Sequence, residues 1–488
     1  MNDIFAKTLL AFAAAAMCAC AVGPDFEKPQ YGGAPEFFKN FGGENISEKS
    51  EEEADIENWW EVFGDSVLNS LVSRALEHNF DLNMARASVE AAYARLGMSQ
   101  SGLLPALDAN GGFSERGTMK GASRGFTSAG LSAGWEIDVF GGVRRGVESA
   151  AADYEAARAN KCAVKMEVAA SVVSAYFLYR YHCEDFEITR QNVETQQNTL
   201  RVIKKRLENK LVSKLDFARS EAQLKSTMAK LPTIEADIGI SLRALEILLG
   251  LDMGSLEGEL KDLRGLPDFE KHAPAAVPAK VLRRRPDVIE AEYKLHAATA
   301  KIGEAEADFY PKFSITGMIS YSAPASANLF NSQYGTWSVG PTVSWNLFSA
   351  GKTYYNVKLQ QALTKQAGIS WRQTVLNAVR EVQDALVASE KQREKTQMLR
   401  QAAQSNKDAY ELSFKLFKAG ELEFLDLLDV QRTMLVAQQS LLDSRRQNLE
   451  NAIALYKALG GGWSGADFKK DEETRKDWLS ELWLTERR

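Results

Sequence analysis

The feature that most constrains the fold of this chain is an internal duplication. Residues 76–114 align without a gap with residues 282–320, at an offset of 206. The aligned identities there include Asp81 with Asp287, Gly97 with Gly303, Pro105 with Pro311 and Ser114 with Ser320. Farther along the offset is 210, so that Trp135 aligns with Trp345 and "ALEILLG" with "ALYKALG". A repeat of this length predicts two copies of one structural unit within one chain.

The duplication predicts a division of the 488 residues into six segments. They are a lipoprotein signal peptide (1–19), a lipid-anchored N-terminal segment (20–65), a first repeat (66–265), a linker (266–279), a second repeat (280–463) and a charged C-terminal tail (464–488). The linker lies in "LRGLPDFEKHAPAAVPAK", whose three prolines interrupt a helix.

Each repeat reads as a helix, two strands, a very long helix, a turn and another helix. The long helices are expected at residues 143–207 and 352–417, and neither interior contains a proline. At 1.5 Å per residue, each would be about 100 Å long. Val375, Val379 and Val382 follow the 4-3 spacing of a coiled coil. A solvated coiled-coil rod is the alternative, and the strand pairs argue against it.

Four segments alternate between apolar and polar residues, as half-buried strands do. Their apolar positions are Leu107, Ala109 and Phe113; Ala129, Leu131, Ala133, Trp135 and Ile137; Phe313, Ile315, Ile319 and Tyr321; and Trp337, Val339, Val343, Trp345 and Leu347. The residues between them are small and often hydroxylated, as in the wetted interior of a membrane barrel. The alternative is a small soluble sheet packed on a core.

Four strands are too few to close a barrel, and open sheet edges are not tolerated in lipid. If the strands cross a membrane, several chains must therefore share one barrel. Two chains give eight strands, whose interior is filled by side chains, and three give twelve, which can leave a channel. The sequence thus predicts a mainly α protein with a β-barrel part, in which helices continue the channel as a tube.

The N-terminus has the pattern of a secretion signal. Lys7 precedes the apolar run "TLLAFAAAAMCAC", which is short and soon followed by Gly23 and Pro24. The ending resembles a bacterial lipobox, and Cys20 fits it better than Cys18 because the small Ala19 precedes Cys20. We expect a diacylglycerol and an N-acyl chain on Cys20, with sorting to the outer membrane. An ordinary signal peptide with incidental cysteines is the alternative.

Several functional classes find no support in the sequence. The net charge of −6 argues against nucleic-acid binding. There is no nucleophile motif or phosphate loop, so we expect no enzyme and no cofactor. The four histidines are scattered without ligand spacing, so we expect no metal site. Cys162 and Cys183 lie 21 residues apart in a helical pattern, about 30 Å, too far for a disulfide.

In their order and spacing, the motifs resemble the TolC-like outer-membrane factors, in particular the NodT-type efflux lipoproteins. The motifs are "CAVGPDFEKP", "WWEVFGDSVLNSLVSRALEHNFDL", "WEIDVFGGVRR", "LRRRPDV", "AEADFYPKFSITG", "FKAGELEFLDLLDVQRT" and "YKALGGGW". The resemblance covers about residues 20–463. It implies a lipid-anchored homotrimer in the outer membrane of a Gram-negative bacterium, with a twelve-stranded barrel and a periplasmic helical barrel.

The resemblance also implies a passive exit duct of a tripartite efflux system. A periplasmic adaptor and an inner-membrane pump, of the resistance-nodulation-division type, would dock at its inner end. Type I protein secretion is the main alternative within the duct interpretation, and a structural envelope lipoprotein is a further one. The strands argue against the scaffold, because a scaffold needs no membrane barrel.

The two helix–helix turns are the expected inner tips, at Ser213 in the first repeat and at Gly420 and Glu423 in the second. Gly420 suits a left-handed C-cap and Ser213 an N-cap. In the family, acidic positions matching Asp426, Asp429 and Asp216 line the periplasmic aperture, where a threefold axis would form carboxylate rings. The alternative is that these carboxylates are solvated acids at helix starts.

The change from strand to helix is expected to form a joint between barrel and tube, once in each repeat. The first joint comprises Trp135, Asp138, Phe140, Gly141 and Gly142, and the second Trp345, Phe348 and Gly351. Six such joints would surround the channel of a trimer.

Overall fold

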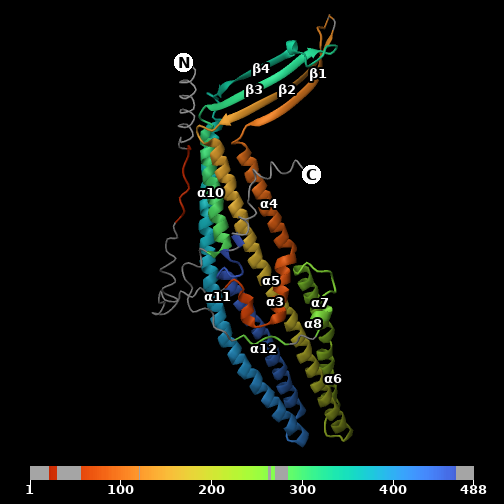
Figure 1. The fold of residues 1–488 in the computed structure, drawn as a ribbon. Coiled ribbons are helices and arrows are strands. Elements are labelled where there is room, and N and C mark those ends of the chain that lie inside the picture. Colours follow the sequence, from red (N-terminus) through yellow and green to blue (C-terminus); the bar gives the residue numbers. More distant parts are fainter. Residues whose placement is uncertain are drawn as a thin grey trace.

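The computed structural model describes residues 21–29, 56–119, 121, 123–261, 265–269, 284–465 and 467–468. The predicted signal peptide, Cys20, most of the linker and most of the C-terminal tail lie outside these residues. A four-stranded sheet lies at one end of an elongated bundle of helices (Figure 1). Both turns that follow the long helices lie at the opposite end (Figure 1).

The element order repeats along the chain. The 3-10 helix η1 (Trp59–Phe63) precedes α3 (Ser66–His78), α4 (Phe80–Ser101), β1 (Ala106–Arg116), β2 (Arg124–Ile137), α5 (Gly142–Glu208), α6 (Lys214–Met228), α7 (Leu231–Leu248) and α8 (Glu257–Leu260). The second part contains α10 (Pro286–Ala307), β3 (Lys312–Pro324), η2 (Ser332–Tyr334), β4 (Gly335–Ser344), α11 (Lys352–Ala419) and α12 (Phe424–Ala458). We call α5 with α6 and α7 the first hairpin, and α11 with α12 the second hairpin.

Two expectations about the elements are corrected. A single helix was expected after each tip, but in the first hairpin it is divided into α6 and α7. Pro232, in the first turn of α7, lacks the N–H that a continuous helix needs. β4 ends at Ser344, so Trp345 and Leu347 lie beyond it. Ser344 pairs with Lys312, and the next partner is Pro311, which has no N–H to extend the ladder.

The sheet confirms the predicted alternation. Its order is β1-β2-β3-β4, with every neighbouring pair antiparallel. One row across the sheet consists of Ala109, Leu131, Ile319 and Trp337. The next row, on the other face, consists of Asn110, Gly130, Ser320 and Thr336. One face is therefore apolar and the other small and polar, and among the described residues β1 and β4 each keep an unpaired edge.

The described helices pack around three apolar clusters of buried residues, one of which joins α4 to α5 through Val89, Ala92, Leu96 and Tyr154. The largest cluster includes Leu71, Tyr176, Phe177, Leu245 and Leu449, and joins α3, α5, α7 and α12. The remaining cluster is near the tips and comprises Ile203, Tyr410, Phe417, Phe424, Leu427, Leu428 and Met434. Among the described helices, α5 contains a window apolar enough to cross a membrane, and 56% of that window is buried inside the protein. This burial is that of a core helix within the bundle.

The final helices of the two repeats, α7 and α12, end in equivalent hydrogen bonds. The Asn79 Nδ2 donates to the carbonyl of Leu248, the last residue of α7, at 2.8 Å. The Arg285 Nη1 donates to the carbonyl of Ala458, the last residue of α12, at 3.2 Å. Asn79 and Arg285 are the N-cap residues of α4 and α10 and are related by the offset of 206. The duplication thus extends to a tertiary contact. In each repeat, the last residue of the final helix, α7 or α12, accepts a hydrogen bond from the N-cap residue of α4 or α10.

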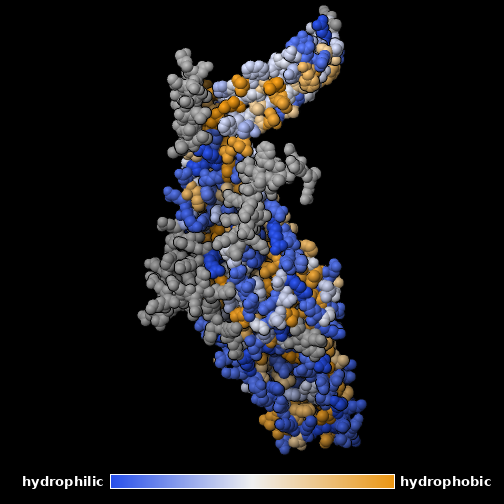
Figure 2. Space-filling model, viewed as in Figure 1, coloured by the Kyte–Doolittle hydropathy of each residue, from blue (hydrophilic) through white to orange (hydrophobic). Residues whose placement is uncertain are grey.

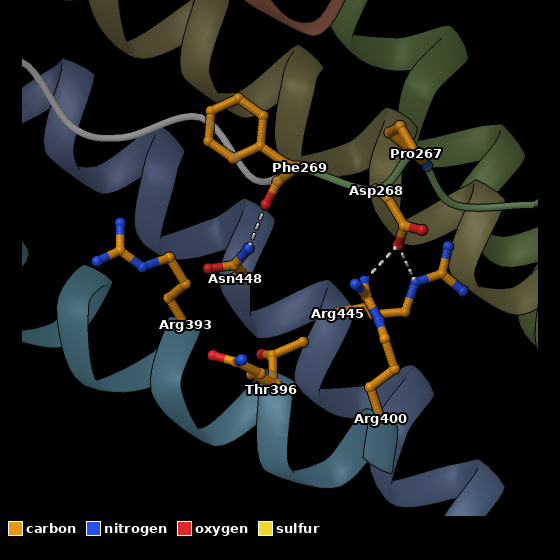
Figure 3. A pocket seen from close by; sticks show the side chains of 9 residues that line it. Pro267, Asp268, Phe269, Arg393, Thr396, Arg400, Arg445 and Asn448 are labelled. Atoms are coloured by element: carbon orange, nitrogen blue, oxygen red, sulfur yellow. Dashed lines mark hydrogen bonds and ion pairs between the residues drawn. The ribbon is translucent and has the colours of Figure 1, made fainter. Parts of the chain in front are cut away.

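The segment between the repeats is held by the second hairpin (Figure 3). Asp268 accepts hydrogen bonds from Arg400 Nη2 of α11 at 3.2 Å and from Arg445 Nε of α12 at 3.0 Å. The Asn448 Nδ2 donates to the carbonyl of Phe269 at 2.7 Å. A polar hollow of about 320 Å³ lies beside these contacts. The carboxylate of Asp268 therefore fastens the inter-repeat segment across both helices of the second hairpin.

Candidate functional site

The first joint turns the chain from β2 into α5 through the carboxylate of Asp138. Its oxygens accept the backbone N–H of Val143 at 3.2 Å and that of Arg144 at 2.8 Å. The Arg144 Nε also donates to Asp138 Oδ2 at 3.3 Å. These N–H groups belong to the first turn of α5 and have no partner within the helix, and a negative charge is favourable there. Asp138 therefore caps the start of α5.

Glycine is required at the first joint by two close approaches. Gly141 has φ of 79°, and a Cβ there would lie 2.5 Å from the Cβ of Ala21. A Cβ on Gly142 would lie 2.8 Å from the Cβ of Ala307, the last residue of α10. Phe140 stacks on Tyr310 with ring centroids 4.5 Å apart. The joint is thus packed between the N-terminal residues and the end of α10.

The second joint repeats part of this arrangement. Gly351, with φ of 87°, is the N-cap residue of α11. The side chain of Phe348 is exposed and, unlike Phe140, lies on the surface of the chain. Both predicted tryptophans make one equivalent contact: Trp135 Nε1 donates to Leu103 O at 2.9 Å, and Trp345 Nε1 donates to Phe309 O at 3.0 Å. Each indole therefore ties the end of a strand pair to the chain just after α4 or α10.

The residues that follow Cys20 in the sequence bind along the first joint. We call residues 21–29 the N-terminal strap; it lies beside α10 (Figure 1). The Val22 N–H donates to Phe140 O at 3.1 Å. Arg145 Nε donates to Val22 O at 3.1 Å, and its Nη2 donates to Gly23 O at 3.2 Å and to Asp25 Oδ1 at 2.7 Å. The strap thus connects the start of α5 with α10.

The strap continues along α10 through two further contacts. Phe26 stacks on His296, with ring centroids 4.4 Å apart. The Lys28 Nζ lies 2.8 Å from Glu292 Oε1. The sequence motif "CAVGPDFEKP" indicated an anchor but did not reveal that the helices bind the residues that follow Cys20.

At the first tip, Ser213 and Asp216 form a reciprocal cap on α6. The Asp216 N–H donates to Ser213 Oγ at 3.1 Å, and the Ser213 N–H donates to Asp216 Oδ2 at 3.0 Å. This is a capping box, which satisfies two otherwise free donors of a helix start. Ser213 is therefore the N-cap, as expected, and the helix-start interpretation accounts for the position of Asp216.

At the second tip, α11 ends at Gly420, which has φ of 89°. Its N–H donates to Phe417 O at 3.1 Å, and the N–H of Glu421 donates to Leu416 O, so Gly420 is the left-handed C-cap that the sequence predicts. Glu423 is the N-cap residue of α12 without a capping bond from its side chain. Asp426 and Asp429 follow on α12, with exposed side chains.

Three polar residues that link the tips of the two hairpins were missed by the sequence analysis. The Arg206 guanidinium of α5 lies 4.7 Å from the ring centroid of Phe417 in α11. The Arg432 Nε of α12 donates to Gln223 Oε1 of α6 at 3.0 Å. For Arg206 the available signal was weak, because basic residues are common in the last turn of any helix. Together with the apolar cluster around Phe417, these contacts hold the two tips together.

Comparison with known proteins identifies the family to which a chain with this sheet and helical bundle belongs. A model of the outer membrane efflux protein family matches residues 71–251 and again residues 277–461. The chain belongs to the outer membrane efflux protein family. Nodulation protein T of Rhizobium leguminosarum bv. viciae is 31% identical over 451 residues, which cover 92% of each chain. The cation efflux system protein CusC of Escherichia coli O6:H1 is 28% identical over 460 residues, covering 93% of this chain and 98% of that protein.

The solved structures agree with this assignment. The outer-membrane channel OprN superposes with a TM-score of 0.81 at 29% identity, covering 91% of this chain and all of that one. A structure of CusC superposes with a TM-score of 0.79 at 26% identity. The protein is an efflux channel of the outer membrane, with its helical part in the periplasm, and the expected fold and family are confirmed. Members of the family are channels and not enzymes.

Proposed function

We propose that three copies of this outer membrane efflux protein share one twelve-stranded barrel, continued by a tube of six hairpins. The observation that carries the proposal is the four-stranded sheet, which has two unpaired edges and an exposed apolar face. Trp337 is 77% exposed and Ile319 55% exposed on that face. Lipid would solvate these side chains, while edge-to-edge pairing with further copies would satisfy the backbone groups of β1 and β4.

We propose that Asp426 and Asp429 line the aperture at the inner end of this tube. Both carboxylates are exposed on the first two turns of α12, at the end opposite the sheet. A threefold axis would gather them into rings that favour cations. Asp216 is a weaker candidate for such a ring, because its carboxylate is held by the backbone N–H and hydroxyl of Ser213.

We propose that Cys20 carries the lipid anchor. Ala21, the next residue, packs against Gly141 at the joint where β2 gives way to α5. This contact supports an anchor at the level of the barrel rim, where acyl chains can enter the inner leaflet. One relative supports the same interpretation: at 28% identity, it is named as a probable outer membrane lipoprotein, SilC, of Salmonella typhimurium.

We propose that the trimer is the passive exit duct of a tripartite system, with a periplasmic adaptor and an inner-membrane pump of the resistance-nodulation-division type. The family assignment supports such partners in general terms. The tip turns and the exposed Leu211, Leu215 and Leu425 offer an apolar surface for docking. Orange side chains gather at this end of the molecule (Figure 2).

The number of copies in the channel tests this proposal most directly. Purified full-length protein in mild detergent should be cross-linked up to a trimer and no further, and it should form ion-conducting channels in planar bilayers. A saturating dimer would leave only eight strands and a filled interior. A monomer, or a trimer that does not conduct, would contradict the duct.

A further inference from the structure

Two arginines lie opposite each other at the end of the sheet away from the helices. Arg116 is the last residue of β1 and Arg124 the first residue of β2, and they are direct partners in the antiparallel ladder. Both are exposed, and the turn between them lies at the far end of the sheet (Figure 1). Directly opposed residues have Cβ atoms about 4.5–5.5 Å apart, and like charges there repel. We call Arg116 and Arg124 the arginine pair; an anion bound between them would relieve this repulsion.

The arginine pair lies on the small, polar face of the sheet. Along β1, Arg116 shares this face with Asn110 and Ser114, because side chains of a strand alternate. The guanidinium of Arg116 lies 6.0 Å from the ring centroid of Phe126, which is the ladder partner of Ser114 and so belongs to the same face. In the proposed barrel this face lines the channel. The arginine pair would therefore lie in water at the outer mouth of the channel.

The adjacent acidic residue, Glu115, lies on the opposite face. Its partner in the ladder is Gly125. A Cβ on Gly125 would lie 2.9 Å from the ring of Phe113, which is one of the apolar positions of β1. The Glu115 carboxylate accepts a hydrogen bond from the Ser123 hydroxyl. Glu115 is therefore directed away from the arginine pair and does not neutralise it on the polar face.

The other strand pair of the chain adds no charge at this end. Residues 313–351 contain no aspartate, glutamate, lysine or arginine. Residues 115–124 contain one acidic residue, Glu115, and three basic ones, Arg116, Lys120 and Arg124, so their net charge is +2. Lys120 lies outside the described residues. The charge at the outer end of the sheet is therefore positive and comes from β1, β2 and the turn between them.

The polar face has the opposite charge near the helices. Asp108 of β1 and Glu136 of β2 are exposed there, whereas the Lys312 Nζ of β3 lies 3.3 Å from Asp308 Oδ1. Asp108 is eight residues from Arg116 along β1, which at about 3.4 Å per residue is about 27 Å. The Debye length at physiological ionic strength is only about 8 Å. The acidic end therefore leaves the field of the arginine pair unopposed.

Resting on the proposed trimeric duct, we infer that the arginine pair is an oxyanion-binding site that makes the outer mouth of the channel select for anions. A guanidinium presents a planar fork of N–H donors that matches two oxygens of a phosphate group. Two neighbouring guanidinium groups suit a dissolved dianion of the phosphate class. A threefold axis would gather the three pairs into a ring opposite in sign to the proposed aspartate rings. Such a ring opposes the re-entry of cations from outside.

Protection from phenylglyoxal, a reagent specific for arginine, tests the site without any current. Purified full-length protein in mild detergent at low ionic strength would be modified with and without pyrophosphate, and each arginine followed by mass spectrometry. At ten times its Kd, pyrophosphate should slow the modification of Arg116 and Arg124 about tenfold. Arg219, exposed on α6, should react at an unchanged rate. Arg124→Gln should remove the protection of Arg116, because the dianion needs both guanidinium groups.

Two control variants complete this design. Glu115→Gln changes the opposite face of the same strand, and Lys312→Gln changes the far end of the same face. Both should keep the protection of the arginine pair. Equal modification of the wild type with and without pyrophosphate, or an Arg116 that stays protected in Arg124→Gln, would overturn the site. Loss of protection in either control would overturn it as well.

Single-channel recordings test the place of the site in the duct. Pyrophosphate should reduce the wild-type current from one side of the bilayer only. Arg116→Gln combined with Arg124→Gln should lose this block and become more cation-selective. Protection without a block would put the site outside the conducting path and refute the selectivity. A trimer that does not conduct would refute the duct and leave the protection result intact.

Discussion

Gly303→Ala offers a test, because one tertiary contact decides whether the substitution stabilises or destabilises the protein. It lies within α10, where glycine is less favourable than alanine by about 1 kcal/mol, so an isolated helix would be stabilised by Gly303→Ala. In this fold, however, a Cβ at residue 303 would lie 2.5 Å from Val22 O and 2.9 Å from the Cγ and Nε of Arg145. The N-terminal strap would have to move away from α10.

The magnitude follows from the bonds that such a movement breaks. Arg145, whose side chain is 6% exposed, donates to Val22 O at 3.1 Å and to Gly23 O at 3.2 Å. Hydrogen bonds from a charged group contribute about 1.5–3 kcal/mol each, so two of them are worth about 3–6 kcal/mol. The ion pair with Asp25 is left out, because that carboxylate is 90% exposed. The helix gain of about 1 kcal/mol is present whether the strap is bound or released, so the attachment of the strap itself is weakened by about 3–6 kcal/mol.

Cleavage by a glutamate-specific protease after Glu27 measures the attachment of the strap. Gly303→Ala should be cut at least about tenfold faster than wild type, since 1.4 kcal/mol corresponds to a factor of ten. Gly97→Ala is the matched control: it is the equivalent position in α4, and a Cβ there meets nothing within 4 Å. It should leave cleavage unchanged. Equal cleavage rates for the two alanine variants would refute the packing of the strap against α10.

Two further predictions concern the proposed sites. Asp426→Asn combined with Asp429→Asn should raise single-channel conductance and lower cation selectivity, because the carboxylate rings are removed. Glu421→Gln at the same tip is the control and should leave both unchanged. If the double variant also conducts as wild type does, the two aspartates have only a helix-start role. Cys20→Ser should abolish incorporation of labelled palmitate while Cys18→Ser should not, and persistent labelling of Cys20→Ser would reject the lipid attachment.

The parts of the fold that depend on local periodicity could be predicted from the sequence. Side chains of a strand alternate between its two faces, so the apolar faces that contain Leu131 and Ile319 could be predicted from each strand alone. Glycine at residue 420 predicted the end of α11, because the left-handed backbone conformation that often ends a helix is less costly for glycine than for a residue with a Cβ. The predicted end of β4 was wrong by a few residues, since Pro311, which stops the ladder, directly precedes β3, the strand with which β4 pairs.

The candidate sites were predicted as positions, and their contacts were not. Asp138 and Gly141 were expected at the first joint, but the reasons for their presence are the N–H groups of α5 and the approach of Ala21. Arg206 and Arg432 were missed, because a basic residue on a helix has the same local pattern whether it is solvated or bound to a partner.

The sequence by itself determined the duplication, the two long helices, the alternating strands and the class of protein. These follow from repetition, periodicity and motifs, which are properties of neighbouring residues. Only the tertiary structure decided that the strap binds Arg145 and that Asn79 and Arg285 receive the ends of α7 and α12. Such contacts join residues more than 100 positions apart, and their energies depend on burial and geometry that no local pattern records.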